Sequence, residues 1–107
     1  MTRNELIERT SRLIAEGERL QQQPSLPAMR TWLQLSDELL SAAWGSMDRY
    51  HLIWLSVGRS NEVRGRRMTP EEESAYVRDV AAQKTAALQM SLKAAQDHMP
   101  FLGETPD

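Results

Sequence analysis

The chain has 107 residues, of which 40% are hydrophobic and 26% charged, and its formal net charge is −2. This length fits one domain, and the weak negative charge argues against a general nucleic-acid coat protein. The absence of cysteine excludes disulfide bonds, thiolate zinc sites and thiol catalysis. No apolar run approaches the ~18 residues that span a bilayer, and the start of the chain lacks the apolar core of a signal peptide. We therefore expect a cytoplasmic protein with no membrane contact. Eleven arginines against two lysines suggest a bacterial or phage source.

The first predicted helix begins after Thr2 and continues to about Leu20. Thr2 and Glu5 have the spacing of a capping box, in which each side chain accepts a hydrogen bond from the other residue's backbone amide. Apolar residues then recur at helical spacing. Gly17 lies on or beside this apolar face, although glycine weakens a helix by up to ~1 kcal/mol relative to alanine. We expect Gly17 to let another helix approach closely.

The second predicted helix follows a turn at residues 21–27. Pro27 suits the first turn of a helix that Ser25 caps. The apolar arc of this helix is wider than a single stripe and continues to about Trp44, after which Gly45 predicts a left-handed C-terminal cap.

A short third helix is predicted from about Ser46 to Val57. One face carries apolar residues at positions i, i+3, i+4 and i+7, namely Tyr50, Ile53, Trp54 and Val57. A helix this short and apolar is either central in the fold or covered by a partner.

The last predicted helix starts at Thr69-Pro70, where a cap and a first-turn proline precede the acidic residues 71–73. It reaches about His98 and is stopped by Pro100. Its ~29 residues would measure about 43 Å, against about 30 Å for the first helix. The long helix must therefore overhang a one-chain bundle, bend, or pair with another subunit.

These elements predict an all-α fold, a small bundle of about four helices. A helical hairpin, a short third helix and a long C-terminal helix form one domain over residues 1–100. Residues 101–107 are expected to be a flexible tail.

The segment between the third and fourth predicted helices is strongly basic. It contains Arg59, Arg64, Arg66 and Arg67. The planar guanidinium suits phosphates and carboxylates, so these arginines are candidates for binding an acidic protein partner or, less readily, nucleic acid or a nucleotide. The favoured alternative is a solvated loop whose arginines neutralise residues 71–73.

Five aromatic residues are candidates for an interface, because such residues are enriched as interface anchors. They are Trp32, Trp44, Tyr50, Trp54 and Tyr76. Helical spacing favours a core position for most of them, but we expect three tryptophans to be too many for one layer of alanines to bury.

Residues with catalytic or metal-binding chemistry form no convincing pattern. Asp48-x-x-His51 places two possible ligands one helical turn apart, but a metal site in a bundle needs several such contributions. We favour a surface acid and an interfacial histidine, and we expect no metal, no cofactor and no catalytic triad.

The sequence therefore predicts a small non-enzymatic interaction or regulatory protein. We expect it to self-associate, as a homodimer, through its second to fourth helices. The alternative is a binder of a phosphate-bearing ligand or nucleic acid that uses the arginine-rich loop 59–67.

Overall fold

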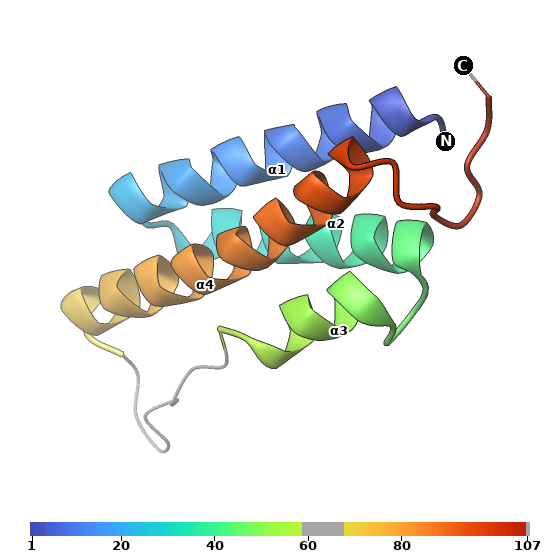
Figure 1. Ribbon diagram of the computed structural model, residues 1–107. Coiled ribbons are helices and arrows are strands. Elements are labelled where there is room, and N and C mark those ends of the chain that lie inside the picture. Colours follow the sequence, from blue (N-terminus) through green and yellow to red (C-terminus); the bar gives the residue numbers. More distant parts are fainter. Residues whose placement is uncertain (59–67, 107) are drawn as a thin grey trace.

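The computed structural model describes residues 1–58 and 68–106, and this part of the chain is helical without strands. The helices are α1 (Arg3–Gln22), α2 (Leu26–Trp44), α3 (Arg49–Ser56) and α4 (Pro70–Gln96), shown in Figure 1. The prediction of an all-α bundle with a short third helix and a long last helix is confirmed. None of these helices has the combination of length and apolar character that crossing a membrane requires.

Local hydrogen bonds explain why the two terminal helices begin where they do. The amide of Glu5 donates to the Thr2 hydroxyl at 3.1 Å, and the Thr2 amide donates to the Glu5 carboxylate at 3.2 Å. The same reciprocal pair joins Thr69 and Glu72 at 3.2 and 3.0 Å. Each pair satisfies two backbone amides that the first turn of a helix leaves without a partner.

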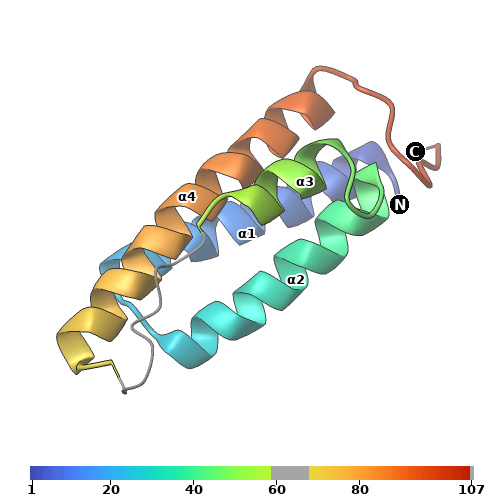
Figure 2. The same ribbon diagram turned by 90° about the horizontal axis from the view of Figure 1, so that it is seen from below.

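The long helices α1 and α4 run antiparallel and make the most extensive contact in the bundle. Helix α2 packs against both of them, and α3 packs against α2 and α4 (Figures 1 and 2). The molecule measures 49 × 24 × 18 Å. The N-terminal end of α4 extends beyond the end of α1, which is the overhang that the helix lengths predicted.

Gly17 is the point at which α1, α2 and α4 approach most tightly around one backbone position. A Cβ atom built on Gly17 would overlap the hydroxyl of Thr85 on α4 and would lie 2.8 Å from Cζ2 of Trp32 on α2. Real Cβ atoms essentially never lie so close to other atoms. The prediction that Gly17 permits close helix packing is confirmed.

The turn between α2 and α3 differs from the sequence prediction in two ways. Gly45 has φ 104° and ψ 143°, so it has a positive φ without the left-handed helical conformation expected of it. Helix α3 begins at Arg49, three residues later than expected, because the Asp48 carboxylate caps it by accepting the Arg49 amide at 2.9 Å. Met47 also has a positive φ of 62°, so the turn is tightly constrained.

The C-terminal segment 101–106 contacts the bundle at several points, although residues 102–106 are exposed. Phe101 is buried, and the Leu102 amide donates to the Ala43 carbonyl at 2.7 Å. Arg3 near the start of α1 forms an ion pair with Glu104 at 2.8 Å. Phe101 occupies a site formed by residues distant in sequence, and the flexibility expected of residues 101–107 stays a prediction.

Candidate functional site

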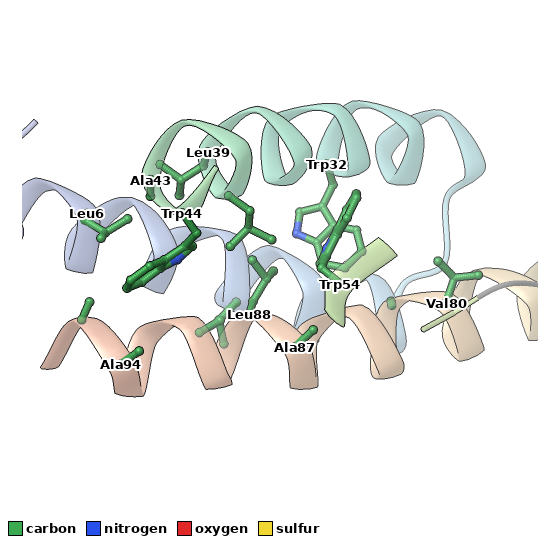
Figure 3. Close-up of a cluster of buried hydrophobic side chains, with 14 of the residues drawn as sticks. Leu6, Trp32, Leu39, Ala43, Trp44, Trp54, Val80, Ala87, Leu88 and Ala94 are labelled. Atoms are coloured by element: carbon green, nitrogen blue, oxygen red, sulfur yellow. The ribbon is translucent and has the colours of Figure 1, made fainter. Parts of the chain in front are cut away.

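The three tryptophans lie inside the bundle, where Trp32, Trp44 and Trp54 are only 2%, 4% and 4% exposed (Figure 3). Their assignment as exposed interface anchors is therefore wrong, and the core alternative is correct. The indole N–H of Trp32 donates to the Leu13 carbonyl, and that of Trp44 donates to the Ser91 hydroxyl, both at 2.8 Å. Small alanine side chains on α4 leave room that these large rings fill, so a single chain buries all three.

The two tyrosines lie at the edge of the core and are half-buried. The rings of Tyr50 and Trp44 meet edge to face, with their centroids 4.8 Å apart and an interplanar angle of 63°. Tyr76 packs against the buried cluster from α4. Both rings cover core residues of their own chain, and their role in an interface stays a prediction.

His51 is buried between α2 and α3, and both of its ring nitrogens are engaged. Nδ1 accepts the Met47 amide at 2.9 Å, and Nε2 contacts the Asp37 carboxylate. Asp48 caps α3 and does not join His51 in a ligand set. Within residues 1–58 and 68–106, no three His, Cys, Asp or Glu residues lie together in a way that could hold a metal ion. In this arrangement His51 fastens α3 and the preceding turn to α2.

The candidate anion-binding residues Arg59, Arg64, Arg66 and Arg67 lie outside the described residues. Their pairing with an acidic partner, with nucleic acid or with residues 71–73 stays a prediction. The chain enters this segment at Gly58, whose amide donates to the side chain of Gln83 on α4 at 3.1 Å.

A groove of about 790 Å³ lies between α1 and α2 and was not predicted from the sequence. Apolar side chains form its floor and sides, with Leu35 51% exposed. The apolar residues of this α1–α2 groove are Met1, Leu13, Ala28, Trp32, Leu35, Leu39 and Ala42. A volume of this size is in the range that binding sites offer to a ligand or to side chains of a partner.

Helix α3 lies away from the groove. Helix α3 packs against α2 and α4 and thereby covers one side of α2. Within the groove, the indole N–H of Trp32 donates to the Leu13 carbonyl and so joins α2 to α1. Among the described residues, those that line the groove belong to α1 and α2, together with Met1.

Charged side chains line both edges of the groove, namely Arg9, Arg12 and Glu16 on α1 and Glu38 on α2. On the α1 edge, Arg9 and Arg12 each pair with a glutamate of their own helix, at 3.7 and 2.5 Å. On the α2 edge, Glu38 accepts a hydrogen bond from the Gln34 side chain at 3.2 Å and has no ion pair among the described residues. Exposed pairs of this kind contribute about 0–1 kcal/mol each, so these side chains are free to change partners at little cost.

The spacing of three apolar residues on α2 is the sequence pattern that could have indicated this groove. Ala28, Leu35 and Ala42 are seven residues apart and share one helix face. The wide apolar arc of α2 implied that some of its residues face away from the main core. Only the packing of α1, α3 and α4 determines which residues those are.

The arrangement offers an apolar floor between a positive and a negative edge, over a length of several helical turns. Proteins use such grooves to bind amphipathic helices, whose apolar face enters the groove. Comparison of the chain with protein-family models, with curated proteins and with solved structures finds no match.

Proposed function

We propose that this chain is a small non-enzymatic interaction protein that forms a homodimer, in which a second copy covers the α1–α2 groove. The exposed apolar floor of the groove, with Leu35 at its centre, carries the proposal. Burying an exposed leucine side chain contributes about 1.5–3 kcal/mol. Because the tryptophans are already buried, the proposed interface moves from the second to fourth helices to α1 and α2.

A second copy suits the groove because the face complements itself in charge. Arg9 and Arg12 make the α1 edge positive at the level where Glu38 makes the α2 edge negative. Two copies of one face therefore meet with opposite charges together in a suitable orientation, without any further partner. An isologous contact of this kind is the commonest way in which identical subunits associate.

Two matched substitutions test the proposed homodimer. Leu35→Gln places a polar amide in the groove, whereas Leu52→Gln makes the same change on α3 outside the groove, at a leucine of similar exposure (46%). Sedimentation equilibrium from about 10 to 300 µM should give the mass of a dimer for the wild type and for Leu52→Gln. Leu35→Gln should shift toward the 12.2 kDa monomer. A wild type that is monomeric throughout, or equal weakening by both substitutions, contradicts the proposal.

A further inference from the structure

We infer that in the homodimer each α1 lies antiparallel against the partner's α2, so that Arg9 and Arg12 face Glu38 of the partner subunit. This inference rests on the proposed homodimer and adds the orientation of the two copies. It concerns charge complementarity across the α1–α2 groove, which has one positive and one negative edge.

The levels of these charges along the bundle follow from the contact that joins α1 to α2. Trp32 donates to the Leu13 carbonyl, and its ring lies against Gly17. Glu38 follows Trp32 by six residues, which is about 9 Å along a helix. On α1, the Trp32 ring lies between the levels of Leu13 and Gly17. Because α2 runs antiparallel to α1, a step of about 9 Å toward the start of α1 from this level leads to Arg9. Arg9, Arg12 and Glu38 accordingly line the same part of the groove.

These opposite charges are not paired with each other within one chain. Arg9 and Arg12 contact Glu5 and Glu8 of α1, and no ion pair among the described residues spans the groove. A helix that fits between the edges therefore needs an acidic group toward α1 and a basic group on the side toward α2, at one level. The face of a second copy supplies both.

A two-fold axis parallel to the helices produces this match. Rotation about such an axis keeps every residue at its own level and exchanges left for right, so α1 comes to lie over the partner's α2. Glu38 of the partner subunit then meets Arg9 and Arg12, and the same contact repeats on the other side. The apolar residues Leu13 and Leu35 lie between these charged groups and become covered.

A two-fold axis perpendicular to the helices gives a poorer match. It reverses the levels and brings α1 against the partner's α1, where Arg9 would meet Glu16 of the partner subunit. Glu16 lies 3.6 Å from Arg19 of its own helix, and Glu38 would face no basic group of the groove. The first orientation uses both edges of the groove, and it is the one we infer.

Charge reversal on opposite edges tests the orientation. Glu38→Arg alone should raise the dissociation constant of the homodimer roughly 10- to 100-fold, because like charges then face one another. Arg9→Glu with Arg12→Glu in one chain should have the same effect. An equimolar mixture of the two variants should form heterodimers nearly as tight as the wild type, since one of the two charged contacts keeps its native signs and the other has them exchanged, so that both are attractive. Native mass spectrometry distinguishes the two masses and reports the heterodimer directly.

Three controls make each result decisive. Glu16→Arg in place of Glu38→Arg tests the perpendicular axis, and Glu18→Arg reverses an exposed charge outside the groove. The variant with Arg9→Glu and Arg12→Glu is replaced if it folds poorly. Arg9→Gln with Arg12→Gln removes the positive charges without adding negative ones, and its homodimer should still be weaker than that of the wild type. The orientation is overturned, but the homodimer is not, if Glu16→Arg restores tight heterodimers with the variant that carries Arg9→Glu and Arg12→Glu. The same holds if none of these changes alters the dissociation constant. A monomeric wild type overturns both.

Discussion

Replacing Gly17 by alanine sets helix propensity against packing at a single position. On propensity alone, alanine in the middle of α1 should stabilise the protein by about 1 kcal/mol. The structure opposes this, because the new Cβ would overlap the Thr85 hydroxyl and lie 2.8 Å from the Trp32 ring. Overpacking a core typically costs about 1–3 kcal/mol, and two such contacts place this site near the upper value. The expected net loss is about 1–2 kcal/mol.

Thermal unfolding followed by circular dichroism measures this loss. A change of 1 kcal/mol shifts the melting temperature of a domain of this size by about 4–8 °C, so Gly17→Ala should melt about 5–15 °C below the wild type at equal protein concentration. Ala15→Gly is the matched control, because Ala15 is exposed on the same helix and reports propensity alone. It should lose only about 1 kcal/mol.

A second substitution identifies the cause of the loss. Thr85→Ala removes the hydroxyl that Gly17→Ala would meet, so the double variant should be more stable than the sum of the single changes by about 1 kcal/mol or more. If Gly17→Ala melts above the wild type, the close approach of α1 and α4 at this point is wrong.

Two further predictions concern single side chains. Hydrogen bonds from the backbone amide and the side chain of Thr2 hold the pKa of Glu5 below its usual value. Thr2→Ala should move the Glu5 pKa upward in an NMR titration. Because the folded pKa is the lower one, this part of the stabilisation is present above the unfolded pKa and is lost as the pH falls through the folded pKa. The difference in the free energy of unfolding between wild type and Thr2→Ala should therefore become smaller in acid. A difference that does not change with pH would refute the link between Thr2 and the Glu5 pKa. Ser36 is fully buried, and its hydroxyl has no hydrogen-bond partner in the described structure. In urea unfolding, Ser36→Ala should leave the free energy of unfolding unchanged or raise it by about 1 kcal/mol. A clear loss would show that the hydroxyl has a hydrogen-bond partner.

The helix starts could be predicted because they depend on residues close together in sequence. The Thr2 and Thr69 caps involve partners three residues away, and the structure contains both. Gly17 was also interpretable, since a glycine in an apolar helix face has few explanations other than close packing. Local chemistry therefore determined the fold class and most helix boundaries.

The positions of large side chains could not be predicted in the same way. Whether Trp54 is buried depends on α2 and α4, which approach it from distant parts of the chain. Phe101 was assigned to a tail because no local pattern shows the site that receives it. The α1–α2 groove is lined by residues of two helices, and no local pattern shows how those helices meet. Such features depend on the relative positions of whole helices, which periodicity does not specify.

The dominance of the contact between the first and last helices has a consequence for how the chain folds. Helix α1 ends at Gln22 and its main partner α4 begins only at Pro70. During synthesis, the apolar face of α1 therefore emerges long before the helix that covers it. Contacts between distant parts of a chain slow folding, since a large loop must close before they form. The part of the α1–α2 hairpin that α4 covers must therefore remain exposed until α4 has been synthesised.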